Sequence, residues 1–141
     1  FKSLLREGGK LAAAFGILER EGQIALVHIV KADGASWHDL PGGGVDEGEV
    51  AEQGVAREFG EEVGLEVTAR TSFALADQFF INTDGDAWNN RGTFFVLDLQ
   101  AERPDLKVED DHTLVWMEPQ AAIRALRHDS HAWAVTAWLR A

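Results

Sequence analysis

The order of hydrophobic and polar positions predicts strands on both sides of one central helix. Two apolar runs, 11–18 and 24–31, flank the polar segment EREGQ and predict a β-hairpin. A short strand is expected in the following segment WHDLPGGGV, where Pro41 and three consecutive glycines end it. From Glu49 to Val63 apolar side chains recur at every fourth position, which is typical of an amphipathic helix.

The second half of the chain predicts more strands and two further helices. The strands are expected at 65–75, 76–81, 92–100 and 113–117, and the helices at about 119–127 and 131–140. Strands before and after one helix, followed by terminal helices, favour an α/β fold with a mixed sheet and helices on both faces. Neither a linker nor a repeat interrupts this pattern, so we expect a single domain over residues 1–141.

Composition and charge narrow the possible partners. The chain has a net charge of −11, which would repel a nucleic-acid polymer, but a small anion could still bind through a bridging divalent cation. Cysteine is absent, which excludes thiolate metal sites and a cysteine nucleophile, and fits a cytoplasmic location. No apolar run approaches the roughly 20 residues of a membrane helix, so we expect no membrane partner.

The expected central helix concentrates negative charge on one face. Glu58, Glu61 and Glu62 project together within about one turn. Gly54 and Gly60 weaken the same helix, each by about 1 kcal/mol relative to alanine. A solvated acidic face is the simplest alternative, but it leaves the combination of repulsion and glycines unexplained. Carboxylate oxygens are ligands for hard cations such as Mg²⁺, so a divalent metal site is the preferred interpretation.

The spacing around these glutamates resembles a known family motif. Residues 43–65 read GGVDEGEVAEQGVAREFGEEVGL and follow the segment LPGG. The series Gly43, five residues, Glu49, seven residues, then REFGEEVGL is similar to the Nudix box of the Nudix hydrolases. This resemblance implies an α/β/α sandwich with a mixed sheet, and a catalytic loop and helix at about 43–64.

The resemblance also implies a metal centre and catalytic roles. The implied metal ligands are Glu58, Glu61 and Glu62, with a backbone carbonyl of Gly42 or Gly43. The implied cofactor is Mg²⁺, with Mn²⁺ as an alternative.

The remaining positions of the box take supporting or catalytic roles. Glu58, Glu61 and Arg57 form the implied catalytic set, with Arg57 orienting a box carboxylate and Glu58 as first choice for the general base. Glu49 is implied as a structural partner of Arg57 or of the loop, Gly43 as a structural position of the box, and Gly64 as the helix C-cap. Val50 stands where the family often has Ser or Thr, so a side-chain N-cap is missing there.

An acidic residue beyond the box often completes such a metal site. The candidates lie in the segment VEDDHTLVWMEP and are Glu109, Asp110 and Asp111, of which we select Asp110. An ordinary polar loop is the alternative for each of them. The histidines have no metal-binding spacing, so His128 and His131 are interpreted as structural or surface residues.

Substrate contacts are expected from aromatic and polar residues outside the box. Trp88 lies in the polar segment NTDGDAWNNRG, which we predict to be a loop, and Arg91 beside it could meet a phosphate. Phe79 is a third candidate, although most aromatic residues of alternating strands face the core.

The resemblance predicts an enzyme that acts on a small nucleotide-type substrate. The expected reaction is metal-dependent hydrolysis of a pyrophosphate linkage in a nucleoside di- or triphosphate derivative, by water attack on phosphorus. The alternatives are a non-catalytic Nudix-like nucleotide-binding module and an acidic protein-interaction domain. A homodimer is possible. The absence of tyrosine, and of proline between the box and Pro104, disfavours diadenosine polyphosphate and ADP-ribose substrates respectively.

Overall fold

The computed structural model describes the backbone of residues 2–3, 5–6, 9–10, 12–81, 85 and 87–141. It describes the side chains of 12–79, 81, 85 and 89–141. Leu11, the first residue of the first predicted strand, lies outside these ranges.

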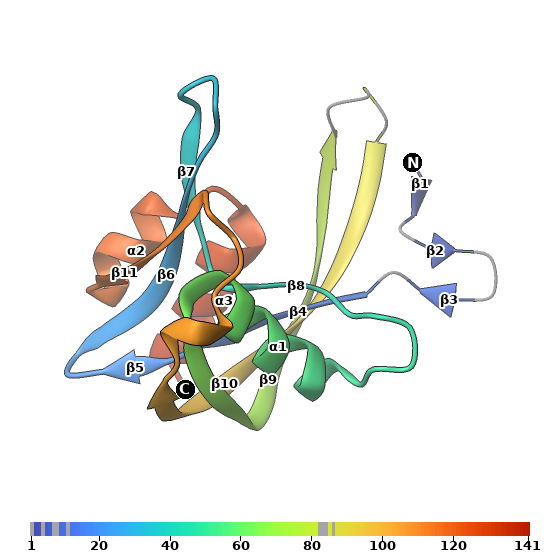
Figure 1. Cartoon of the computed structure of the whole chain (residues 1–141). Coiled ribbons are helices and arrows are strands. Elements are labelled where there is room, and N and C mark those ends of the chain that lie inside the picture. Colours follow the sequence, from blue (N-terminus) through green and yellow to red (C-terminus); the bar gives the residue numbers. More distant parts are fainter. Residues whose placement is uncertain (1, 4, 7–8, 11, 82–84, 86) are drawn as a thin grey trace.

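The strands form two main sheets beside each other (Figure 1). The first is mixed, because β10 pairs in parallel with β1 and β4 but antiparallel with β9, and β8 pairs antiparallel with β4. Its strands are β1 (Lys2–Ser3), β4 (Ala12–Ile17), β8 (Gly42–Gly44), β9 (Leu65–Ile81) and β10 (Ala87–Glu102). The second sheet is antiparallel and consists of β5 (Glu19–Arg20), β6 (Gln23–Val30), β7 (Ser36–Asp39) and β11 (His112–Met117). A separate short pair joins β2 (Leu5–Arg6) to β3 (Gly9–Lys10).

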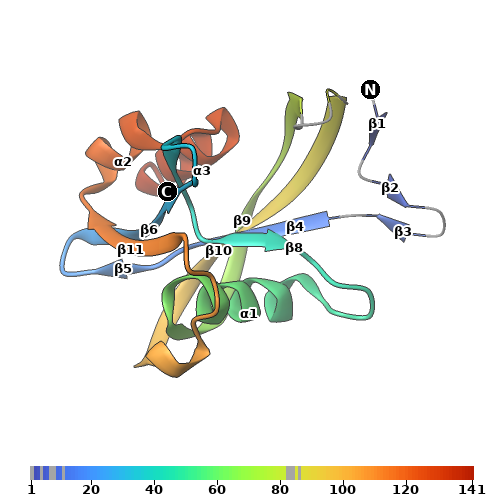
Figure 2. The ribbon, with the colours of Figure 1, turned by 45° about the horizontal axis from the view of Figure 1, so that its top comes forward.

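Helices cover the sheets from two sides, as Figure 2 shows. Helix α1 (Ala51–Val63) lies on one side, and α2 (Pro119–Ala125) and α3 (Asp129–Leu139) lie on the other. A single 3₁₀ turn, η1 (Pro104–Leu106), follows β10. This arrangement confirms the predicted α/β fold with helices on both faces of a mixed sheet. Among the described residues, no helix is both long and apolar enough to cross a membrane.

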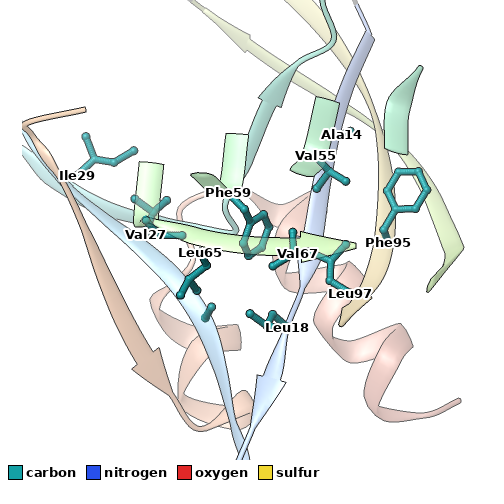
Figure 3. Close-up of a cluster of buried hydrophobic side chains, with 12 residues drawn as sticks. Ala14, Leu18, Val27, Ile29, Val55, Phe59, Leu65, Val67, Phe95 and Leu97 are labelled. Atoms are coloured by element: carbon teal, nitrogen blue, oxygen red, sulfur yellow. The ribbon is translucent and has the colours of Figure 1, made fainter. Parts of the chain in front are cut away.

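Strand β4 separates two apolar clusters, because both of its faces are buried. Ala14 faces the cluster that contains Val55 and Phe59 of α1, part of which Figure 3 shows. Phe15, the next residue along, faces the cluster that contains Val135 of α3. Successive side chains of a strand point to opposite faces, so one short strand joins the core under α1 to the core under α3.

The predicted hairpin of 11–18 and 24–31 is correct only near its turn. Strands β5 and β6 pair across the turn at Glu21 and Gly22, and the Ala25 N–H donates to the carbonyl of Leu18 at 3.0 Å. Strand β4 instead continues into the first sheet, between β10 and β8. Its burial on both faces requires neighbours on both edges and helices on both sides, which a two-stranded hairpin with β6 does not supply.

Two further strand predictions are corrected. The segments 65–75 and 76–81 form one continuous strand, β9, and its partner β10 begins at Ala87 rather than at Gly92. Residues 87–92 of the predicted loop are therefore strand along their backbone, whereas positions 82–84 and 86 lie outside the described residues. Asn89 and Asn90 have low β-propensity, and pairing with β9 overrides it.

The glycines that were expected to end a strand form strand β8. Gly42 has φ +147°, and a Cβ there would lie 2.2 Å from the carbonyl oxygen of Ala14. The close approach of β8 to β4 therefore requires glycine at this position. It brings the start of the predicted box directly beside the central strand.

Helix α1 begins two residues later than predicted, at Ala51, and has no side-chain N-cap, as the valine at position 50 predicts. The Val50 N–H donates to Gln53 Oε1 at 3.0 Å, which is one half of a capping box, but no side chain at position 50 accepts from the first turn. At the other end Gly64 is the predicted C-cap, with φ 68°, and its N–H donates to the Gly60 carbonyl at 3.1 Å.

Candidate active site

Arg57, on α1, holds the loop and the helix of the box together. Its Nε and Nη2 donate to the two carboxylate oxygens of Glu49, at 2.9 and 3.1 Å. Nη2 also donates to the carbonyl of Gly44 at 2.9 Å, and Nη1 donates to Glu58 at 2.9 Å and Glu61 at 3.2 Å. The planar guanidinium therefore fixes the relative position of three carboxylates, a geometry that lysine cannot reproduce.

The loop before α1 is ordered by Glu49, which also accounts for one of the helix glycines. The Asp46 N–H donates to Glu49 Oε1 at 2.9 Å. A Cβ on Gly54 would lie 3.1 Å from the same oxygen, and a Cβ on Gly60 would lie 3.3 Å from Leu106. The space beside Gly54 is therefore filled by the Glu49 side chain. Packing explains both glycines without a cation.

Glu58 lies against the glycine strand β8. A Cβ on Gly43 would be 3.0 Å from Glu58 Cδ and 3.1 Å from its Oε2, so the side chain fits only because Gly43 has none. Burial raises the pKa of the Glu58 carboxyl, and its hydrogen bond to Arg57 opposes that rise. The Glu58 carboxylate thus lies between the Arg57 guanidinium and the backbone of Gly43.

Glu62 is the most buried of the three glutamates, at 8% exposure. Its Oε1 accepts a hydrogen bond from the Gly42 N–H at 3.1 Å. Burial, followed by the negative charges of Glu58 and Asp39, raises the pKa of Glu62 to about 9. Its protonated carboxyl shares a hydrogen bond with Glu58, so the two groups compete to carry one negative charge.

These carboxylates suit a divalent cation. Three glutamates of one helix face converge beside the backbone of β8, which gives the all-oxygen donor set that Mg²⁺ prefers. A bound cation would also neutralise the buried charge that Glu58 and Glu62 cannot both carry alone. The residues present therefore fit the metal that the resemblance implies.

A second group of potential ligands lies where the loop after η1 enters β11. Among the described residues, one atom each of Glu109, Asp111 and His112 lies within 4.8 Å of the others. Asp110, our sequence-based choice, is exposed and is not part of this group. His112 Nδ1 contacts Asp111 Oδ1 at 2.6 Å, and its Nε2 lies 4.0 Å from Glu62 Oε2. The loop therefore reaches the box through His112.

A cavity of about 260 Å³ opens beside the box. It shares Gly42 and Gly43 with the carboxylate site, and strands β4, β7, β9 and β10 and the start of α3 form its walls. Its other lining residues are Phe15, Asp39, Ala76, Gln78, Asn90, Gly92, Phe94, Arg127, His128, Ser130 and His131. A group bound there would lie next to the carboxylates.

Comparison with known proteins assigns the family. The NUDIX domain family model matches residues 9–139. The chain belongs to the Nudix hydrolase family. The uncharacterized Nudix hydrolase orf19 of Rhodococcus erythropolis is similar, with 34% identity over 112 residues. That match covers 73% of this chain but only 60% of the relative's length.

Solved structures show the same fold. A NUDIX hydrolase from Nitrosomonas europaea has a TM-score of 0.78 and 17% identity, over 92% of this chain and 88% of that one. The ORF135 protein of E. coli has a TM-score of 0.65 and 24% identity, over 92% and 89% of the two chains. The Nudix α/β fold is therefore established for this chain.

Two of the three predicted substrate residues, Phe79 and Arg91, lie on the opposite side of the β9–β10 ladder from the cavity of this Nudix domain. Phe79 is 50% exposed, and Arg91 pairs with Asp77 at 2.9 Å. Their strand neighbours Gln78 and Asn90 face the cavity instead. The side chain of Trp88 lies outside the described residues.

Two histidines and one ion pair at the cavity were not predicted as site residues. His131 is buried, its Nδ1 accepts a hydrogen bond from the Leu40 N–H at 3.1 Å, and burial holds its pKa well below the usual value. His128 lies beside it, with ring centroids 5.1 Å apart. Asp39 pairs with Arg127 at 2.6 Å, across 88 positions of sequence. No local pattern links residues so far apart, so only the fold reveals this pair.

Proposed function

We propose that this chain hydrolyses a pyrophosphate linkage in a nucleoside di- or triphosphate derivative, using Mg²⁺ or Mn²⁺. The observation that carries the proposal is the position of Glu58, Glu61 and Glu62 on one face of α1 beside β8, with Arg57 bound to two of them. An acidic face made only for solubility would need neither the shared guanidinium nor the space left by Gly43. Family membership supports the same reaction.

The residues divide into binding and orienting roles. Glu58, Glu61 and Glu62 would hold the cation, together with a backbone carbonyl of Gly42 or Gly43. When bound, the cation would neutralise developing charge on the phosphates and lower the pKa of attacking water.

The other box residues prepare this site. Arg57 fixes the directions of the Glu58 and Glu61 carboxylates, and Glu49 fixes Arg57. Glu58 is our choice for the general base, because burial raises its pKa toward the range where a carboxylate accepts a proton effectively. We keep the loop of Asp110 as a source of an additional acidic ligand, and the geometry favours its neighbour Asp111 in that role.

A phosphate-release screen over nucleotide derivatives with Mg²⁺ or Mn²⁺ tests this proposal. We expect turnover in wild type and a loss of roughly 100-fold or more in kcat for Glu58→Gln and Glu61→Gln, as for removal of a strongly stabilising group. Glu52→Gln is the matched control, because Glu52 is an exposed glutamate of the same helix. Turnover that survives both chelation and Glu61→Gln would refute the assigned site. Metal-stabilised nucleotide binding without turnover would indicate a non-catalytic module instead.

A further inference from the structure

Strands β6 and β7 place two histidine side chains face to face. His28 and His38 are directly opposite in the register of this antiparallel pair, whose strands lie side by side in Figure 1. Their imidazole rings are stacked, with centroids 4.5 Å apart and an angle of 15° between the ring planes. Their separation in sequence matches no local metal-binding spacing, so only the pairing of the strands brings the two rings together.

The two rings lie at the margin of an apolar cluster. Leu26 and Leu40, two positions away along β6 and β7, belong to the cluster that contains Ala122 of α2. Side chains two positions apart in a strand share a face, so His28 and His38 project on this same side of the sheet. Both histidines are half-buried. One part of the stacked pair therefore contacts the protein, and the other part is accessible to solvent or to an ion.

The ring nitrogens of this pair have no partner within the described part of the chain. The contact that involves both side chains is the stacking itself, and neither ring makes a hydrogen bond or an ion pair with a described residue. Other histidines of the chain are fixed by the protein, since Nδ1 of His131 accepts from the Leu40 N–H and Nδ1 of His112 contacts Asp111. Half-buried nitrogens without protein partners require them from solvent or from a ligand.

The chemistry of two adjacent imidazoles suits a transition metal. Burial, followed by the neighbouring His28, lowers the pKa of His38, so this ring is neutral and has a free lone pair at neutral pH. Neutral imidazole nitrogens suit Zn²⁺, Cu²⁺ and Ni²⁺, whereas Mg²⁺ prefers oxygen ligands. Zn–N bonds of about 2.0–2.1 Å hold two ligating nitrogens roughly 3–3.4 Å apart. Rings whose centroids lie 4.5 Å apart reach this spacing by small side-chain rotations.

We propose that His28 and His38 bind one divalent transition-metal ion, with Zn²⁺ as first choice and water completing its coordination. This site is separate from the carboxylates of α1 and does not depend on the proposed hydrolysis. The ion would join β6 to β7, a strand of four residues that, among the described residues, pairs with β6 and forms one isolated bridge to Leu126. Because β7 leads directly into Gly42, a bound ion would also stabilise the approach to the box.

Metal binding by the unaltered chain tests this inference first. Tag-free wild-type protein, stripped of metal and placed in excess Mg²⁺ to occupy the carboxylates, is titrated with Zn²⁺. Long-range ¹H–¹⁵N NMR follows the imidazole nitrogens. We expect the signals of His28 and His38 to change together with one Kd, while those of buried His131 stay unchanged. No change in either ring of the pair, or a change confined to His112, would overturn the inference.

Thermal unfolding of variants gives a second measurement with a matched control. We expect Zn²⁺ at about tenfold its Kd to raise the Tm of wild type by roughly 3–6 °C in excess Mg²⁺. His28→Gln and His38→Gln should each abolish this increase, because one imidazole alone binds weakly. His112→Gln is the control, since it removes a histidine from the other potential metal-binding group, with Glu109 and Asp111, and should retain the increase. An increase that persists in either His28→Gln or His38→Gln, or that His112→Gln abolishes, would refute the site. If the variants do not fold, the wild-type NMR titration decides.

Discussion

At the scale of single residues, the site depends on a glycine that leaves room for a carboxylate. Gly43→Ala would place a Cβ 3.0 Å from Glu58 Cδ, and Glu58 cannot retreat without losing its hydrogen bond to Arg57. We expect kcat to fall by about 10- to 100-fold with little change in Tm, because a displacement of about 1 Å at a catalytic group has such an effect. Steady-state kinetics and thermal unfolding measure the two quantities.

The adjacent glycine supplies the control for this substitution. A Cβ on Gly44 would meet no atom within 4 Å, so Gly44→Ala should retain wild-type kcat. If both alanine variants lose activity equally, strand flexibility rather than the position of Glu58 would explain the result for Gly43.

The substitution Arg57→Lys tests whether the carboxylates are positioned by the geometry of the guanidinium or by its charge alone. Lysine keeps the charge of Arg57 but cannot reach Glu49, Glu58 and Glu61 together with a single ammonium group. We expect Arg57→Lys to lower kcat by at least tenfold. It should also lower the free energy of unfolding by about 1–2 kcal/mol, since Glu49 loses its two-point partner in a partly exposed site. Arg70→Lys, at an exposed pair with Asp98, should change neither quantity appreciably. Wild-type kcat in Arg57→Lys would show that charge alone suffices.

At the scale of elements, local patterns predicted α1 and the order of strands well. Val55, Phe59 and Val63 recur at every fourth position, and this spacing predicted the helix. All three side chains are buried, as an apolar helix face should be. The pairing of strands could not be predicted in the same way. Strand β10 begins in a polar segment whose β-structure depends on pairing with β9. Strand β4 pairs with β10, which is distant in sequence, and not with β6, which follows it closely along the chain. These contacts are non-local, so no short pattern encodes them.

The candidate site likewise has a part that the sequence predicts and a part that only the fold reveals. The carboxylates of α1 share one helix, so their spacing in sequence fixes their proximity. The cavity combines Asp39, Asn90 and Arg127 from three separate elements, and only the complete fold brings them together. Alternation along β9 also placed Gln78, not Phe79, in the cavity, a choice that depends on which face of the strand meets α3.

The C-terminus of α1 offers a prediction about stability at this scale. Gly64 has φ 68°, and a Cβ there would also lie 3.2 Å from Pro104 Cα. We expect Gly64→Ala to lower the free energy of unfolding by about 1–2 kcal/mol from the backbone conformation, and further because of this contact. Gly22→Ala is the matched control, because Gly22 has φ 80° but open space around it. Denaturant unfolding of both variants should show the larger loss for Gly64→Ala, and equal losses would contradict a role for the Pro104 contact.

At the scale of the whole molecule, burial of Glu62 in a chain of net charge −11 links stability to pH. The folded-state pKa of Glu62 is about 9, against 4.5 in the unfolded chain. Between these two values the folded protein holds a proton that the unfolded chain has released, so the contribution of Glu62 to stability falls as pH rises from 4.5 to about 9. Below pH 4.5 the group is protonated in both states, and above pH 9 it is ionised in both, so the dependence ends at either side.

The window from pH 7 to 9 isolates this effect. It lies above the range in which buried His131 would have to gain a proton, and the chain has no tyrosine or cysteine to titrate there. Without metal, we expect the Tm of wild type to fall from pH 7 to pH 9. Glu62→Gln should show a smaller fall in Tm over the same range, because the amide cannot ionise. Mg²⁺ binds the ionised carboxylate, so the increase in Tm that it produces should be larger at pH 9 than at pH 7. Thermal scans at both pH values, with EDTA or millimolar Mg²⁺, provide the four measurements. A metal effect that does not depend on pH, or one that Glu62→Gln leaves unchanged, would show that the cation does not bind at Glu62.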